Sequence, residues 1–348
     1  MDPPFHAPDL TSDLIDSSNQ CLHPHNPKMT LSTATGPTST YSVAGHLKTR
    51  KPKSTSEEIG DIIRAFLQHF DTTDLPSIWD PTLEALCLAE AERRGYSTDV
   101  LRPYLTLGLN ITVSAYHYID DDNVKVFIAF FCMFLIYLDD VYPDDSDALG
   151  GVPDFTKRFT SSKKQSSKIL NDLADLLTES SQHFGKVAAD FIVHSALKFI
   201  TGLILEVQSK QESTQRVEEY AIFLREQCGL AEAFAMFIFP RDLPFHLYIQ
   251  ALPSMRDFID FANDILSFYK EECSGDTNNF ISLLARARGS PKNQVLCYVV
   301  TQCLESYERV LRILSPHQEA YMAFTEFTDG YLALHLGMKR YRLSELGL

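Results

Sequence analysis

The sequence predicts an all-α protein, and three observations carry that prediction. Apolar residues recur at helical spacing almost without interruption after residue 54. No stretch of the sequence alternates apolar and polar residues between turn residues, and no βαβ rhythm or fixed-period repeat occurs. A chain of 348 residues, 45% of them hydrophobic, can bury a large core. We therefore predict a single bundle of roughly ten helices.

The first 54 residues differ from the rest of the chain. They hold seven of the seventeen prolines among many serines and threonines, without any periodicity. Such a segment buries too little apolar surface to offset the entropy of ordering it. We predict a disordered, low-complexity tail over 1–54 and a helical domain over 55–348. A basic cluster ends the tail, and we interpret it as a solvated linker in preference to a cover over an anionic ligand. The cluster is Lys48, Arg50, Lys51 and Lys53.

The first helix of the domain is predicted by its start signal. A Ser-Thr pair at 54–55, followed three residues later by glutamates at 57–58, forms a capping box. Apolar residues from Ile59 to Phe70 then follow at helical spacing. Further helices are expected at about 81–94, 98–118, 122–141, 164–208, 214–238, 244–273, 276–288, 291–313 and 316–345.

The helix expected over 122–141 is apolar on all sides. Its stretch Val126–Leu138 has no polar face, which places it at the centre of the bundle. The acidic residues 120–122 before it are explained by capping of the helix N-terminus, and we assign them no catalytic role.

Two carboxylates, Asp139 and Asp140, follow at the other end of this apolar helix. Buried carboxylates are costly, so they are usually neutralised, paired or bound to a metal. The alternative is that both lie outside the core, with Pro143 starting a loop. Acid at a helix C-terminus opposes the macrodipole, which weakens that alternative.

A second polar face is expected on the helix from about Leu252 to Glu272. Asn263, Ser267 and Glu271 are spaced i, i+4 and i+8, so their side chains project from one face. An amide oxygen, a hydroxyl and a carboxylate are hard oxygen ligands, which Mg²⁺ prefers. The competing interpretation is an ordinary solvated stripe.

Composition excludes several classes of partner. A net charge of −15 argues against nucleic acid and anionic membranes, which attract basic surfaces. The seven cysteines show neither a disulfide framework nor a zinc pattern. The longest apolar run is too short to span a bilayer and the first residues do not resemble a signal peptide, so we expect a cytoplasmic protein. His117, His194 and His335 lack ligand spacing to one another, and we interpret them as core or surface residues.

Four motifs follow one another along the chain. They are the aspartates from Asp139, the stretch Leu224–Gly229 followed by Phe239-Pro240, the Asn-Asp-x-x-Ser-x-x-x-Glu run from Asn263 to Glu271, and Arg340-Tyr341-Arg342-Leu343. In this order they resemble the motifs of class I terpene cyclases, most closely the fungal trichodiene synthase group. The resemblance covers about residues 56–346.

The resemblance implies a single helical domain that binds a prenyl diphosphate through three Mg²⁺ ions and holds its hydrocarbon in an apolar cavity. It implies metal binding by Asp139 in the first motif and by the Asn263, Ser267 and Glu271 set in the second. It also implies diphosphate binding by four residues, namely Arg225, Lys270, Arg340 and Tyr341. A homodimer is a further expectation from the resemblance.

Two departures from the family pattern flank the expected diphosphate site. Position 143 is proline, which displaces the third acid of the first motif to Asp144 and leaves its role, or that of Asp145, open. The basic motif starts at Met338, where relatives place an aspartate. We therefore expect a product of the longiborneol or brasilane type before trichodiene.

Aromatic residues are expected to line the cavity, because their faces can stabilise a carbocation. The alternative for each is plain core packing. The candidates are Phe131, Phe134, Phe258 and Phe261.

The leading hypothesis is a Mg²⁺-dependent sesquiterpene cyclase that ionises farnesyl diphosphate and ends by deprotonation or water capture. A terpene cyclase for another chain length and a head-to-tail prenyltransferase are alternatives within the same chemistry. Prenyltransferases, however, carry two aspartate-rich motifs. A catalytically silent helical binding protein is the alternative from another class.

Overall fold

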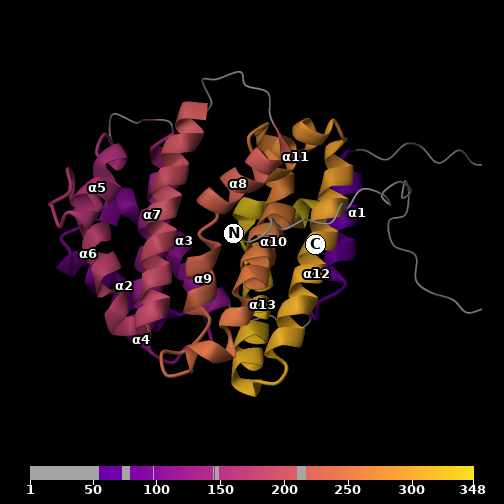
Figure 1. Ribbon diagram of the computed structural model, residues 1–348. Helices are drawn as coiled ribbons and strands as arrows, with labels where there is room; N and C mark the ends of the chain where they lie inside the picture. The colour runs from indigo at the N-terminus through magenta and orange to yellow at the C-terminus, as the bar shows by residue number, and fades with distance from the viewer. Residues whose placement is uncertain (1–54, 73–78, 97, 144, 146–148, 210–216) are drawn as a thin grey trace, which may run out of the picture. The chain divides into compact units, whose positions relative to one another are not determined.

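The computed structural model describes residues 55–72, 79–96, 98–143, 145, 149–209 and 217–348 (Figure 1). The predicted tail, 1–54, lies outside these residues. The described residues form helices and no strand, which confirms the all-α prediction. The α-helices are α1 (Thr55–Leu67), α2 (Pro81–Arg93), α3 (Thr98–Ala115), α4 (Asp122–Val141), α5 (Phe155–Thr160), α6 (Lys168–His183), α7 (Lys186–Ser209), α8 (Glu218–Cys228), α9 (Ala231–Phe237), α10 (Leu252–Ser274), α11 (Phe280–Arg288), α12 (Lys292–Leu314) and α13 (Gln318–Gly337). The 3₁₀ helices are η1 (Val152–Asp154), η2 (Phe245–Leu247), η3 (Ile249–Ala251), η4 (Lys339–Tyr341) and η5 (Leu343–Leu346).

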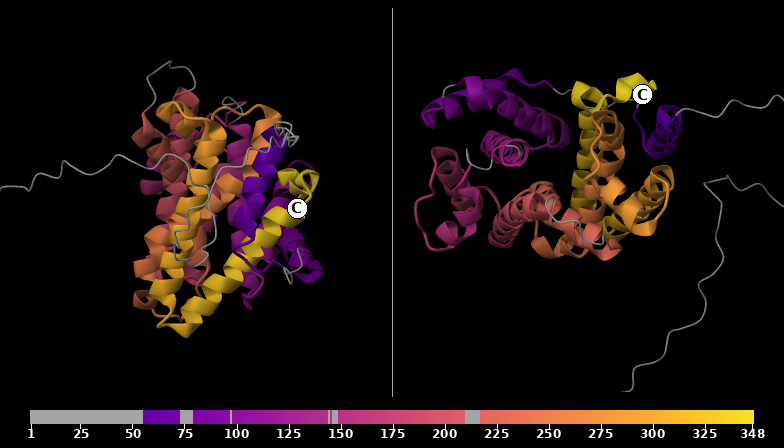
Figure 2. Two further views of the ribbon diagram at one scale, coloured as in Figure 1. Left: turned by 90° about the vertical axis from the view of Figure 1, so that its right-hand side faces the viewer. Right: turned by 90° about the horizontal axis from the view of Figure 1, so that it is seen from above.

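Helix α4 lies in the core, as its sequence predicts. Every residue from Phe127 to Leu135 is buried. The Asp121 side chain accepts a hydrogen bond from the Asn123 amide at 2.9 Å, which confirms the predicted N-terminal cap. Helix α4 packs on α3, α2 and α6, whereas α10 packs on α12, α9 and α1 (Figure 2). Helix α13 packs along α3 and so connects these two groups. This packing fixes the positions of α4, α10 and α13 relative to one another.

Several predicted helices are shorter than the sequence pattern suggested; the range 244–273, for example, becomes an α-helix only at Leu252, after η2 and η3. The range 164–208 is interrupted at Phe184, whose extended backbone (φ −119°, ψ 159°) separates α6 from α7. The range 214–238 is interrupted at Leu230, which adopts a left-handed conformation (φ 55°) between α8 and α9. The range 316–345 ends as an α-helix at Gly337, because Met338 is extended. Apolar spacing continues across each break, since Phe184 and Leu230 still point into the core, so periodicity alone could not locate these breaks.

Two glycines allow α3 to approach its neighbours closely. A Cβ atom at Gly108 would lie 2.2 Å from the Ala129 carbonyl oxygen on α4. One at Gly330 on α13 would lie 1.9 Å from the Ser114 carbonyl oxygen on α3. Both obstacles are backbone atoms, which cannot move without shifting a helix. The position of α4 and α13 relative to α3 therefore depends on these two glycines.

We expect Gly108→Ala to lower the free energy of unfolding by about 1–3 kcal/mol, because the added methyl group forces α3 away from α4. Denaturant unfolding of the purified chain measures this. Gly185→Ala is the matched control, since its Cβ would meet nothing closer than the Arg241 carbonyl oxygen at 3.8 Å. Equal stability of the two variants would contradict the close helix contact.

Helix α7 is, within the described residues, the one helix long and apolar enough to cross a bilayer. Half of that stretch is buried inside the protein, and core helices of this kind satisfy the same length and composition test. Helix α7 is therefore weak evidence for a membrane span.

Candidate active site

A cavity of about 200 Å³ lies where α4, α8, α10 and α13 approach one another. Four polar residues proposed from the sequence line it together, namely Asp139, Arg225, Asn263 and Tyr341. The apolar and aromatic part of the lining is Ile111, Leu135, Ile136, Phe199, Leu230, Phe234, Ile259, Tyr331 and Leu334. Residues more than 100 positions apart in the sequence thus share one apolar cavity with charged groups at its wall.

Asp139 lies in the last turn of α4, beside the cavity. Desolvation by the surrounding protein, together with the neighbouring acids Glu206 and Asp140, raises the pKa of its carboxyl to about 6. The Arg340 and Lys270 cations oppose this rise. The Asp139 residue is exposed, so solvent screens these interactions. The structure therefore brings one acid of the first motif close to two cations from distant parts of the chain.

The two cations gather around one aromatic ring. The Lys270 Nζ atom lies 5.5 Å from the centroid of the Tyr341 ring, and the Arg340 Cζ atom lies 5.8 Å from it. Tyr341 itself is buried. Burial lowers the pKa of Lys270, and the Arg340 charge lowers it further, whereas the neighbouring Glu271 carboxylate raises it. Two cations held this close together form a site that favours a multiply charged anion.

Asn263, Ser267 and Glu271, proposed as metal ligands from the sequence, all lie on α10 at i, i+4 and i+8. Ser267 is 2% exposed and hydrogen-bonded to Glu271, while Asn263 and Glu271 are half-buried. Burial raises the pKa of the Glu271 carboxyl, whereas Ser267 and the Lys270 ammonium lower it. The Glu271 Oε1 atom lies 3.8 Å from Lys270 Nζ, so this half-buried carboxylate has a cation close by. This all-oxygen donor set fits a hard divalent cation such as Mg²⁺. Across the described part of the chain, no cluster of three or more His, Cys, Asp or Glu side chains could hold a metal.

Arg225 is held by two carboxylates for which the sequence motifs predicted no role. Its Nε donates to both Asp264 carboxylate oxygens at 2.9 Å, and its Nη2 donates to the Asp260 carbonyl oxygen at 2.9 Å. Its Nη1 forms an ion pair with Asp260 Oδ1 at 3.1 Å. Burial raises the pKa of Asp260 to about 7 despite this guanidinium, and burial likewise raises that of Asp264. The i, i+4 spacing of these aspartates on α10 was the available signal for a cation-binding pair.

Gly229 makes room for this arrangement. A Cβ atom there would lie 2.2 Å from Asp260 Oδ1 and 2.8 Å from Arg225 Nη1. Helix α8 ends at Cys228, and the left-handed Leu230 turns the chain into α9. The break between α8 and α9 therefore lies directly at the ion pair and lines the cavity.

The four phenylalanines predicted to line the cavity lie outside its lining. Phe131 packs against Phe127 and Phe237, and Phe134 against Phe130 and Tyr96. Phe258 packs against Phe70, Tyr307 and Phe324, and Phe261 stacks on Phe280. We correct that prediction to core packing.

The helical period could have identified some of the residues that line the cavity. Leu135 lies four residues before Asp139, and Ile259 lies four residues before Asn263, so each shares a face with its polar residue. Phe134 and Phe258 lie five residues before, which rotates them by about 140° around the helix. Phe199, Phe234 and Tyr331 come from other helices, and no signal in the sequence marked them.

Two acids and three histidines complete the set of residues considered from the sequence. Asp144 lies outside the described residues, and Asp145 is exposed in the turn after α4. His117 is hydrogen-bonded to Glu326 at 3.0 Å, and His194 is exposed. His335 is fully buried, and its Nε2 lies 3.3 Å from Asn263 Nδ2. Burial and the Lys270 and Arg340 charges lower the His335 pKa to about 4, against the hydrogen bond to the Tyr331 carbonyl, which raises it.

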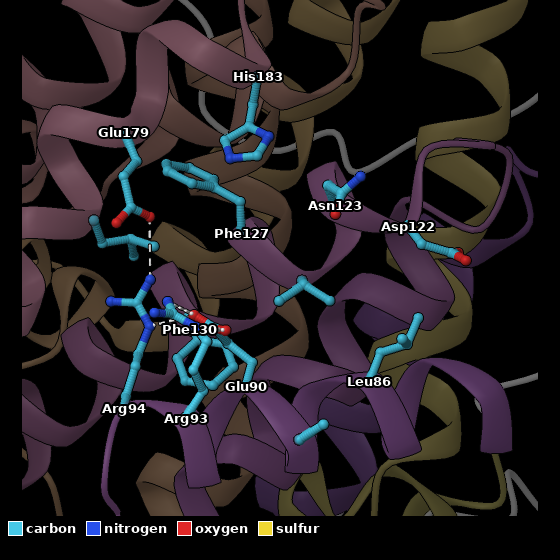
Figure 3. Close-up of a pocket in the computed structure, with 13 residues that line it drawn as sticks. Leu86, Glu90, Arg93, Arg94, Asp122, Asn123, Phe127, Phe130, Glu179 and His183 are labelled. Atoms are coloured by element: carbon cyan, nitrogen blue, oxygen red, sulfur yellow. Dashed lines mark hydrogen bonds and ion pairs between the residues drawn. The ribbon is translucent and has the colours of Figure 1, made fainter.

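Two larger pockets are lined by none of the proposed metal and diphosphate residues. One, of about 560 Å³, is bounded by α2, α4 and α6 (Figure 3). Its Arg94 guanidinium is paired with Glu90 at 2.6 Å and Glu179 at 3.1 Å, and its Arg93 is paired with Glu90. The other, of about 730 Å³, has Arg241 and a larger number of acidic residues at its wall, namely Asp120, Asp121, Asp242, Glu319 and Glu326. Paired or acidic groups of this kind suit an anionic substrate less than the smaller cavity does.

An all-helical bundle with acidic and basic groups around an apolar cavity is the architecture of the class I terpene synthases. In solved structures, a linalool/nerolidol synthase from Streptomyces clavuligerus, determined in complex with 2-fluorogeranyl diphosphate, shares this fold at a TM-score of 0.61 and 15% identity, covering 78% of this chain and 99% of that one. The chain belongs to the trichodiene synthase family, since the family model described as Trichodiene synthase (TRI5) matches residues 104–347.

Curated relatives agree with this assignment. The chain is 34% identical to the alpha-cuprenene synthase COP6 of Coprinopsis cinerea over 295 residues, covering 83% of this chain and 90% of that one. It is 32% identical to Monoterpene synthase 25 of Postia placenta over 293 residues, covering 82% and 86%. The resemblance inferred from the motifs is thereby confirmed at the level of the terpene synthase family.

Proposed function

We propose that the protein is a Mg²⁺-dependent sesquiterpene cyclase that converts farnesyl diphosphate into a polycyclic product and releases diphosphate. The observation that carries this proposal is that Asp139, Arg225, Asn263 and Tyr341 line one apolar cavity. A charged wall suits the diphosphate, and an apolar interior suits the hydrocarbon. The family assignment supports the same chemistry.

Four residues would hold the metal ions, for which we propose a set of three: Asp139, Asn263, Ser267 and Glu271. When bound, Mg²⁺ neutralises the charge that develops on the leaving diphosphate oxygen. Lys270 and Arg340 supply positive charge beside Tyr341, and Arg225 on α8 lines the same cavity. The Arg225 and Lys270 side chains are largely buried, where electrostatic stabilisation exceeds its value in water, whereas Asp139 and Arg340 are exposed.

The apolar wall controls the fate of the carbocation that ionisation leaves behind. Leu135, Ile259 and Leu334 exclude water from it, and the Phe199 and Phe234 rings offer their negative faces. A cation over such a face gains about 2 kcal/mol or more when desolvated. We propose a hydrocarbon or alcohol of the longiborneol, brasilane or trichodiene type, formed by deprotonation or water capture.

Incubation with geranyl, farnesyl and geranylgeranyl diphosphates, with Mg²⁺ or with EDTA, tests the proposal. Gas chromatography–mass spectrometry should show a cyclic C15 product from farnesyl diphosphate that EDTA abolishes. Turnover only with added isopentenyl diphosphate would instead indicate a prenyltransferase. A folded, metal-supplied protein that consumes none of the substrates would indicate a silent binding protein.

A shorter substrate is the second candidate. The cavity of about 200 Å³ is smaller than the roughly 300–1,000 Å³ usual for small-molecule pockets. A relative named as a monoterpene synthase shares 32% identity with this chain. Preferred turnover of geranyl over farnesyl diphosphate in the same experiment would favour this candidate.

A further inference from the structure

The structure places a buried histidine directly behind one proposed metal ligand. His335 on α13 is 0% exposed, and both of its ring nitrogens have partners. Its Nδ1 lies 2.7 Å from the Tyr331 carbonyl oxygen, and its Nε2 lies 3.3 Å from Asn263 Nδ2 on α10. This contact connects the helix that carries the proposed ligands to the neighbouring helix.

The partners of His335 determine its tautomer. A carbonyl oxygen can only accept a hydrogen bond, so Nδ1 must carry the proton. The atom that faces Nε2, at 3.3 Å, is the Asn263 amide nitrogen, which can only donate a hydrogen bond. Nε2 is consequently an acceptor, and the group facing it must be a donor.

That requirement orients the Asn263 side chain. Only the amide NH₂ of Asn263 can donate to Nε2, so its Oδ1 atom is left to face away from His335. The opposite amide orientation would set two acceptors against each other and would present NH₂, which cannot bind a cation, toward the α10 face. By accepting a hydrogen bond from Asn263, the His335 ring therefore selects the one amide orientation in which the Asn263 Oδ1 atom can bind a metal ion.

The His335 ring is itself fixed on both sides. The Tyr331 ring packs edge-on against it with centroids 4.7 Å apart, and the Tyr341 ring lies 4.4 Å away. The Tyr331 hydroxyl donates to the Ile259 carbonyl oxygen at 3.1 Å, one turn of α10 before Asn263. Helices α10 and α13 are thus joined at two successive levels, which leaves the ring little freedom to turn.

We infer that His335 is a positioning residue that holds the Asn263 amide oxygen toward the proposed metal site. The inference rests on the proposed role of Asn263 as a metal ligand. It assigns no contact between His335 and the metal or the substrate. The spacing of the sequence motifs could not reveal this contact, because His335 and Asn263 lie 72 residues apart.

Binding of Mg²⁺ in the presence of inorganic diphosphate, measured by isothermal titration calorimetry on the full chain, tests this. We expect His335→Phe, which keeps a planar ring without an acceptor, to weaken Mg²⁺ binding by roughly tenfold to 100-fold. His335→Gln, whose side-chain oxygen can accept from Asn263, should recover much of that loss. In an Asn263→Ala background, His335→Phe should cause no additional loss.

The outcomes separate this inference from the proposed function. Parent-like Mg²⁺ binding by Asn263→Ala would overturn the metal role of Asn263 and the inference with it. Two other outcomes would overturn the inference alone. In the first, Asn263→Ala weakens Mg²⁺ binding but folded His335→Phe binds Mg²⁺ like the parent. In the second, the losses of Mg²⁺ binding in the two single variants add in the double variant.

A measurement on the unsubstituted chain decides the matter where His335→Phe does not fold. Nitrogen-15 NMR of histidine-labelled protein, with the His335 signal assigned through His335→Gln, reports which ring nitrogen carries the proton. We expect protonated Nδ1 and unprotonated Nε2. Protonated Nε2 would overturn the inference, because the ring would then donate to Asn263 and select the opposite amide orientation.

Discussion

Arg225→Met is expected to lower the free energy of unfolding by about 3–5 kcal/mol and to abolish measurable terpene formation. In the parent protein the Arg225 guanidinium forms ion pairs with Asp260 and Asp264, whose side chains are 5% and 11% exposed. Removing it leaves two buried carboxylates without their cation, and uncompensated buried charge is strongly destabilising. Turnover falls for a separate reason, since the cavity loses a proposed diphosphate donor. Urea unfolding and product analysis measure the two effects.

Neutralising the two acids separates these effects. Adding Asp260→Asn and Asp264→Asn to Arg225→Met removes the unpaired charges with little change of shape, so most of the lost stability should return. Turnover should not return, because no cation has been restored. An Arg225→Met chain as stable as the parent would contradict the structural importance of these ion pairs. Recovered turnover in the triple variant would contradict the diphosphate role of Arg225.

Much of the fold could be predicted from local pattern. The apolar surface of α4 required burial, and both of its observed ends match the prediction. The i, i+4, i+8 spacing placed Asn263, Ser267 and Glu271 on one face because helix geometry is the same in every sequence. The breaks at Phe184 and Leu230 could not be predicted in this way, because both residues are apolar and buried in the interrupted conformation.

Residues of the candidate site could be named from the sequence only where they belong to motifs. Asp139 and Tyr341 were identified through motifs, whereas Asp260 was missed although it lines the same cavity. Its role depends on Arg225, which lies 35 residues earlier, and on the absence of a side chain at Gly229. Contacts of this kind arise from how helices pack, and a single sequence carries no periodic signal for them. The same reason hid the contact between His335 and Asn263.

Asp139→Ala is expected to reduce kcat/KM for farnesyl diphosphate by roughly 10²–10³-fold, the range typical for loss of one group that stabilises developing charge. The neighbouring substitution Asp140→Ala is the matched control. Both carboxylates lie in the last turn of α4 and both residues are exposed, but Asp139 lines the cavity, whereas Asp140 lies outside the lining. Asp140→Ala should therefore stay within about tenfold of the parent, since an exposed charge outside the cavity contributes little. Steady-state kinetics with equal folded protein, checked by circular dichroism, measure the difference. Equal losses in the two variants would show that the acidic end of α4 acts through its total charge, and the assignment of Asp139 as the ligand of the first motif would then be wrong.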